Sequence, residues 1–234
     1  MQIKNLKKNF INYCKKNKFE VNTRQVKVIE LLTQFYIKNF SSKNFITSIF
    51  SNKKNKLGFY LYGEVGVGKT MVLNFFFNSL NIKRKRLHFN EFMISYHDFV
   101  HKNKKKQNSL NLFVSNIKKK YELLFFDEFQ VTNIVDAMIL GRLFKSMFKE
   151  NLKIIVTSNS KIEELYKDGL QREQFLPFID IFKSLCIEQK LIIDTDYRKS
   201  NTKNLDYFFY PVNNHTRFFI NQIFRKLTKN KKIQ

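Results

Sequence analysis

The chain has 234 residues, 43% of them apolar and 27 of them phenylalanine, which suffices to bury the core of one globular domain with a small additional region. Its 43 basic and 19 acidic residues give a net charge of +24, which attracts nucleic acids, anionic membranes and acidic proteins. Asn, Ile and Phe are abundant together with Lys, as in chains with an A/T-rich coding bias, so the charge alone identifies no partner. Nucleic acid and peripheral contact with a membrane stay open.

The two cysteines and the N-terminal residues bear on the compartment. Cys14 and Cys186 lie far apart and lack metal-ligand spacing, which argues against a disulfide framework or a zinc knuckle. Residues 1–20 lack the apolar core of a signal peptide, and a transit peptide is rich in arginine, whereas the first arginine here is Arg24. Since no apolar run is long enough to span a bilayer, we expect a cytoplasmic protein.

Residues 1–50 are predicted to form a helical N-terminal segment. In QVKVIELLTQFYIKNF, the apolar residues Val26, Ile29, Leu32, Phe35 and Tyr36 recur at helical spacing and can share one face. No linker marks a second domain before about residue 195, because the chain has only two prolines. We therefore assign 51–198 to one core domain and 199–234 to a C-terminal lid.

The core is predicted to alternate strands and helices. Short apolar runs without polar alternation indicate buried strands at 59–62, 86–89, 122–127, 153–158 and 190–195. Helix-length segments lie at 70–80, 92–101, 133–148, 161–168 and 177–185. Asn133 with Asp136, and Ser160 with Glu163, have the spacing of N-terminal helix caps. This order predicts an α/β fold with a parallel five-stranded sheet covered on both faces.

The segment GEVGVGKT fits the phosphate-binding pattern of strand, glycine-rich loop and helix. Three of the six glycines of the chain stand here and let backbone N–H groups surround a phosphate at the N-terminus of a helix. Lys69 is expected to reach the β- and γ-phosphates of ATP, and the Thr70 hydroxyl to bind Mg²⁺. The candidate ATP-binding residues are Gly63, Glu64, Val65, Gly66, Val67, Gly68, Lys69 and Thr70.

Acidic and polar residues end the next strands. LLFFDEF places Asp127 and Glu128 at a strand end, where the first suits Mg²⁺ and the second can polarise a water in line with the γ-phosphate. Asn159 follows the strand 153–158, so it is expected to hold the attacking water or to touch the γ-phosphate. The alternative for Asn159 is a helix cap, although Ser160 and Glu163 already offer one.

Arg172 is one of few arginines in a chain that favours lysine, and it comes after the predicted short helix that follows Asn159. At that separation we expect it at the rim, where it reaches the nucleotide of a neighbouring subunit. His97 and His101 have the spacing of two metal ligands but lack a third. Arg142 and Arg198 are either functional or ordinary surface ion pairs.

The order of these motifs resembles that of AAA+ ATPases, whose arginine finger acts across a subunit interface. More closely, RLHFNEFM, FDEFQVTNIVDAMILGRLF, TSN, ELYKDGLQREQFLPFI and DTDYR resemble the ZapE cell-division ATPases of bacteria and their mitochondrial relatives, the ATPase-family-gene-one proteins. NTRQVKVIELL resembles the first helix of that family and implies Gln25 as an adenine contact. Asn90 and Asn133 depart from the family, which usually has histidine and aspartate there.

The resemblance implies an AAA+ P-loop three-layer sandwich with Asp127 and Glu128 as metal and water pair, Asn159 as first sensor and Arg172 as finger. It also implies an ATP-hydrolysing homo-oligomer that regulates cell division through the tubulin-like division ring protein, or, in the mitochondrial branch, a factor in membrane-protein turnover. The chain stops at RKLTKNKKIQ, where the family continues into helices with a late arginine motif, so the lid is expected to be truncated.

Two other functions stay open. A replication-type helicase loader or initiator would suit the basic charge and the short chain, although GLQREQFLPFI argues against it. A nucleotide-dependent scaffold would bind ATP with little turnover because its lid is incomplete.

Overall fold

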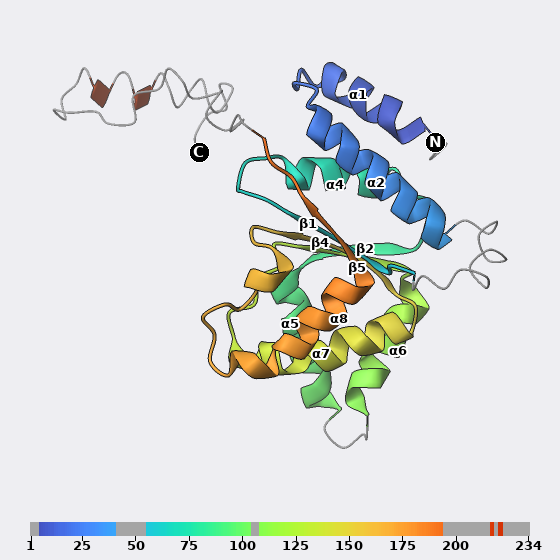
Figure 1. Ribbon diagram of the computed structural model, residues 1–234, viewed down its shortest axis with the longest axis vertical. Coiled ribbons are helices and arrows are strands. Elements are labelled where there is room, and N and C mark those ends of the chain that lie inside the picture. Colours follow the sequence, from blue (N-terminus) through green and yellow to red (C-terminus); the bar gives the residue numbers. More distant parts are fainter. Residues whose placement is uncertain (1–4, 41–54, 104–107, 194–215, 218–219, 222–234) are drawn as a thin grey trace. The chain divides into compact units, whose positions relative to one another are not determined.

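The computed structural model describes residues 5–40, 55–103, 108–193, 216–217 and 220–221 (Figure 1). The chain divides into two compact units, Met1–Asp194 and Thr195–Gln234. In the second unit, residues 216–217 and 220–221 are helical. Arg198 of the predicted core and all other residues of the predicted lid, 199–234, lie outside the described residues.

The first unit contains a five-stranded parallel sheet in the order β2-β3-β4-β1-β5. The strands are β1 (Gly58–Tyr62), β2 (Arg84–His88), β3 (Leu123–Asp127), β4 (Lys153–Ser158) and β5 (Cys186–Lys190). Every residue of β3 and β4 is buried, because helices cover both faces of the sheet. The predicted parallel α/β fold is confirmed.

The helices form two layers around the sheet (Figure 1). Along β3, Leu123 and Phe125 join one apolar cluster, whereas Leu124 and Phe126 join the other, since neighbouring residues of a strand face opposite sides. The first cluster includes α1 (Leu6–Lys16), α2 (Thr23–Phe40) and α4 (Lys69–Asn78), and the second includes α5 (Phe89–Lys102), α6 (Ser109–Lys120), α7 (Ile134–Lys149) and α8 (Leu176–Leu185).

The N-terminal helices are amphipathic and pack on the layer of the phosphate loop. In α1, Leu6, Phe10 and Cys14 recur every four residues and are buried. Phe10 packs edge-on against Phe75 of α4, with ring centroids 5.1 Å apart. Helices α1 and α2 thereby pack against α4. No helix in the described part of the chain has both the length and the apolar character that a membrane crossing needs.

The predicted position of the fifth strand needs correction, and one helix was not predicted. The fifth strand was expected at 190–195, but β5 ends at Lys190, and residues 194–195 lie outside the described ones. β5 is an edge strand with alternating exposure, so its sequence CIEQK lacks the apolar run used to find the others. Helix α6 was not expected, because only Phe113 and Val114 of its residues are buried.

The predicted helix at 161–168 is wrong. Only Ile162–Glu164 forms a helical turn, of the 3-10 type, and Ser160 makes no side-chain cap there. Tyr166 has a left-handed backbone with φ of +54°, which ends regular helix. The cap predicted at Asn133 is present, since its side chain accepts a hydrogen bond from the Val135 N–H (2.8 Å).

Candidate nucleotide-binding site

The phosphate loop joins β1 to α4 at the carboxyl end of the sheet, the edge where ligands bind in open parallel sheets. Its glycines are required by space as well as by conformation. Gly68 has φ of +81°, and a Cβ there would lie 2.6 Å from Nε2 of Gln25. A Cβ at Gly63 would lie 2.2 Å from the Leu191 carbonyl oxygen. The backbone at both positions can therefore approach its neighbours only because side chains are missing.

Lys69 begins α4, and its side chain is buried in the loop. Its Nζ donates to the carbonyl oxygens of Gly63 (2.7 Å) and Glu64 (2.8 Å) and to Oδ1 of Asn159 (3.0 Å). These three oxygens match in number the three N–H donors of the ammonium. A phosphate oxygen that binds Lys69 would replace some of these contacts, and the change would be transmitted to Asn159.

Gln25 lies at the start of α2 and is 1% exposed. Its Nε2 donates to the Val67 carbonyl oxygen (3.1 Å), which ties the N-terminal helix to the phosphate loop. Its Oε1 is buried without a hydrogen-bond partner. The side chain thus supports the loop backbone in this structure, and a contact with adenine stays a prediction.

Asp127 ends β3 and is 4% exposed. One carboxylate oxygen accepts a hydrogen bond from the Thr157 hydroxyl, and the other pairs with the guanidinium of Arg86. Each oxygen retains capacity for a second partner. The carboxylate is therefore held in place by two strands, β4 and β2, that flank its own.

Glu128 follows in a left-handed conformation, with φ of +54°, which is uncommon for a residue with a side chain. Its N–H donates to Oγ1 of Thr157 (3.1 Å), which fixes this turn. The side chain is 81% exposed, and its carboxylate lies 3.7 Å from Nδ1 of His88. Asp127 is thus buried and Glu128 exposed, and the separate metal and water roles of the two acids stay predictions.

The donor set suits Mg²⁺ bound together with phosphates. Mg²⁺ at nucleotide sites takes one or two protein oxygens, phosphate oxygens and water. The Asp127 carboxylate and the exposed Thr70 hydroxyl on α4 are such oxygens. No group of three or more histidine, cysteine or acidic side chains in the described ranges has the arrangement of a metal cage. His97 instead pairs with Asp136 of α7, at 2.7 Å.

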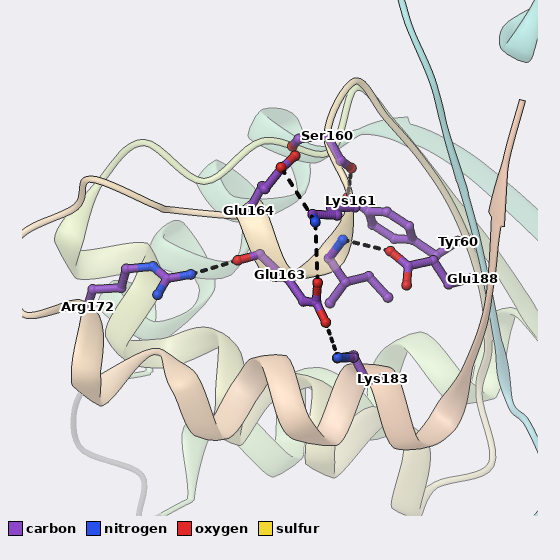
Figure 2. Close-up of polar contacts among 9 residues, drawn as sticks. Tyr60, Ser160, Lys161, Glu163, Glu164, Arg172, Lys183 and Glu188 are labelled. Carbon is purple, nitrogen blue, oxygen red and sulfur yellow. Dashed lines mark hydrogen bonds and ion pairs between the residues drawn. The ribbon is translucent and has the colours of Figure 1, made fainter. Parts of the chain in front are cut away.

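Arg172 lies in a short 3-10 helix, Arg172–Gln174, between the β4 loop and α8. Its Nη2 donates to the Glu163 carbonyl oxygen (2.7 Å), and the Glu163 carboxylate pairs with Lys183 of α8 (Figure 2). Figure 2 also shows that this loop is fixed to the sheet, since the Tyr60 hydroxyl donates to the Ser160 carbonyl oxygen (2.8 Å). The position of Arg172 thus depends on the loop that follows Asn159.

Sequence reasoning missed two residues that contact Asp127. Thr157 lies near the end of β4, two positions before Asn159, and this closeness in sequence to a predicted site residue was the available signal. Arg86 is one of eight arginines in a chain with 43 basic residues, and that rarity was the available signal. Neither contact follows from the motif patterns, because both arise from pairing between strands far apart in sequence.

The fold and the phosphate loop define an AAA+ P-loop domain. The structure of AMPPCP-bound DnaA from Aquifex aeolicus is similar with a TM-score of 0.52 and 19% identity, over 92% of this chain and 65% of that chain. A DnaC helicase loader is similar with a TM-score of 0.50 and 13% identity, over 74% and 92% of the two chains. At these identities the likeness shows the fold alone.

Within this class, the chain belongs to the AFG1-like ATPase family, whose model matches residues 6–234. It is 39% identical over 165 residues to Lactation elevated protein 1 homolog B of Danio rerio, and the matched region covers 65% of this chain and 33% of that protein. It is 35% identical over 176 residues to Cell division protein ZapE of Escherichia coli K12, which covers 75% and 47%. The predicted family is confirmed, and the matched region spans less than half of either relative.

Proposed function

We propose that the chain hydrolyses ATP to ADP and phosphate. The observation that carries this proposal is that Lys69 of the phosphate loop donates to Asn159, which follows β4, while Thr157 of β4 holds the Asp127 carboxylate. Thr70 and Asp127 would hold Mg²⁺, which would supply positive charge to offset that of the phosphates, and Lys69 would bind the phosphates.

In this proposal Glu128 accepts the proton of the attacking water. Its carboxylate can reach solvent because its side chain is exposed. Asn159, which follows β4, positions the attacking water and the Lys69 ammonium. General-base catalysis of this kind contributes about 100-fold or more.

Replacement of Glu128 by glutamine tests the proposal, because it removes the base and keeps the shape. We expect Glu128→Gln to bind a fluorescent ATP analogue with wild-type affinity and to lose at least about 100-fold in turnover. Glu150→Gln, an exposed acid at the far end of α7, is the matched control. Wild-type turnover in Glu128→Gln would remove Glu128 as the base.

We also propose that the active form is a homo-oligomer in which Arg172 contacts the γ-phosphate of a neighbour. Support comes from its partly exposed position in the loop between β4 and α8 and from the ability of a guanidinium to bridge two oxygens. Mixing Lys69→Ala with Arg172→Ala should restore turnover, because one chain then supplies the site and the other the finger. Mixing Lys69→Ala with Glu128→Gln is the control, since no intact site can form. Absence of recovery in the first mixture would exclude a finger in trans.

The biological role proposed is regulation of cell division through the tubulin-like division ring protein. Support comes from the similarity to Cell division protein ZapE of Escherichia coli. Polymers of the ring protein should pellet together with Glu128→Gln in ATP and leave Lys69→Ala in solution. Equal pelleting of the two variants would contradict an ATP-dependent role.

The net charge of +24 favours a second candidate, a helicase loader or initiator acting on single-stranded DNA. It requires DNA binding that is salt-dependent and coupled to ATP, measured by fluorescence anisotropy. A scaffold that binds ATP without turnover is separated from both by steady-state ATPase assays over a range of protein concentrations. A rate per chain that rises with concentration supports hydrolysis in an oligomer, and zero rate throughout supports the scaffold.

A further inference from the structure

Arg86 connects the acidic strand to the helix of the phosphate loop. Its Nη2 pairs with Oδ2 of Asp127, and its Nη1 donates to Oδ1 of Asn74 on α4 (2.5 Å). The guanidinium carbon lies 5.3 Å from the ring centroid of Phe125, the residue opposite Arg86 in the paired strand β3. One side chain of the edge strand therefore contacts β3 and α4 at once.

The geometry explains why arginine stands here in a lysine-rich chain. Two nitrogens of a planar fork reach a carboxylate and an amide in different directions, whereas the ammonium of lysine is a single point of charge. The fork also lies on an aromatic ring, which favours guanidinium. Asp127 is deeply buried and Arg86 is half-buried, so the charge of Arg86 acts on the carboxylate with limited screening by solvent.

We propose that Arg86 is a positioning residue that makes metal binding at Asp127 depend on nucleotide. It links the Asp127 carboxylate of β3 to Asn74 of α4, and its positive charge opposes a divalent cation at the same carboxylate. A metal ion is then retained only when the phosphates of a nucleotide add their negative charge. This inference rests on the proposed function, which assigns Asp127 to Mg²⁺.

The arrangement has two separable parts, charge and fork. Arg86→Met removes the charge and keeps an unbranched side chain over Phe125. Arg86→Lys keeps the charge and loses the fork. If charge controls the metal, the two variants must differ, whereas a purely structural role of Arg86 would affect both in the same direction.

The experiment measures metal binding without turnover. Mn²⁺ binding to the nucleotide-free full chain is followed by electron paramagnetic resonance, and folding of each variant is checked by circular dichroism. We expect no Mn²⁺ binding to the wild type below about 1 mM and binding at least about 10-fold tighter in Arg86→Met, because a unit charge next to the carboxylate is gone. Arg86→Lys should stay within about threefold of the wild type.

Asp127→Asn provides the control for the site itself. It should abolish the Mn²⁺ binding gained by Arg86→Met in the double variant, and the double variant also avoids an unpaired buried carboxylate. Should the single Arg86→Met variant not fold, the wild type still decides, since Mn²⁺ binding tighter than about 100 μM without nucleotide contradicts the proposal. Equal metal affinity in Arg86→Met and Arg86→Lys also overturns it. If Asp127→Asn leaves the Mg²⁺ dependence of ATP binding unchanged, the assignment of Asp127 fails instead.

Discussion

Thr157 offers a direct test of how the acidic pair is held. Its hydroxyl donates to the Asp127 carboxylate and accepts a hydrogen bond from the Glu128 N–H (3.1 Å). The side chain is 1% exposed, so water cannot easily substitute for it. Thr157→Val keeps the volume and removes both hydrogen bonds.

The expected loss in stability follows from these two contacts. A hydrogen bond to a charged group contributes about 1.5–3 kcal/mol, and a buried group left without a partner costs a similar amount. The Asp127 carboxylate keeps Arg86 as a partner, which limits its penalty. We therefore expect Thr157→Val to lower the free energy of unfolding by about 2–3 kcal/mol.

The expected loss in activity is larger than the loss in binding. The left-handed turn at Glu128 is strained, and without the Thr157 hydroxyl it can relax and move the carboxylate. A displacement of about 1 Å at a catalytic group lowers kcat by up to about 100-fold. The KM for ATP should change by less than about threefold, because Lys69 and the loop are untouched.

Steady-state ATPase assays and urea unfolding of Thr157→Val and Thr157→Ser check this reasoning. Serine retains the hydroxyl, so Thr157→Ser should keep at least about half of the wild-type kcat. A wild-type kcat in Thr157→Val would refute the claim that this hydroxyl positions Glu128. Equal losses in both variants would point to the missing methyl group instead.

Two further predictions concern stability. Burial lowers the pKa of the Lys153 ammonium from 10.5 to about 8, so between these pH values the unfolded state binds the extra proton and stability should rise with pH. Urea unfolding at about pH 7 and about pH 10 should show that Lys153→Met lacks this rise, which amounts to about 2 kcal/mol after allowance for solvent at the ammonium. A Cβ at Gly58 would lie 2.2 Å from Sγ of Cys186. We therefore expect Gly58→Ala to lower the stability in thermal unfolding by about 2 kcal/mol or more, and Cys186→Ala in the same chain to restore most of this loss. An unchanged melting temperature in Gly58→Ala would contradict the clash.

The central strands could be predicted from sequence, whereas the edge strand β5 could not. β1, β3 and β4 are covered on both faces, so their residues are mostly apolar and contrast with the amphipathic helices. β5 pairs with one neighbour only, and its polar residues face solvent. Its mixture of apolar and polar residues is therefore as typical of a loop as of a strand.

The helix expected after Asn159 failed for a local reason. Tyr166 adopts a left-handed conformation, and its ring lies against Gly169, where a Cβ would come within 2.1 Å of it. This packing depends on the whole loop and leaves no periodic pattern. The sequence argument against a capping role for Asn159 relied on a cap at Ser160 that the structure lacks. The Asn159 side chain nevertheless contacts Lys69.

The candidate motif residues could be predicted from sequence because phosphate chemistry fixes their types and order along the chain. Their supports could not, because Arg86 and Thr157 reach Asp127 through strand pairing. A motif pattern describes residues that contact the ligand, whereas the partners that hold them are chosen by the fold. The rare use of arginine and the closeness of Thr157 to Asn159 were the sequence features that pointed to such partners.

The end of β4 links the proposed catalytic groups to the proposed finger. Thr157 holds the acidic pair, and Asn159 contacts Lys69 two residues later. Farther along the same segment, the Glu163 carbonyl oxygen accepts the hydrogen bond from Arg172 (Figure 2). A phosphate that draws Lys69 away from Asn159 would therefore act on the segment that positions Arg172. Because the hydroxyl of Tyr60 and the side chain of Lys183 hold this segment to the sheet and to α8, Asn159 and Arg172 are joined by an anchored segment and not by a free loop.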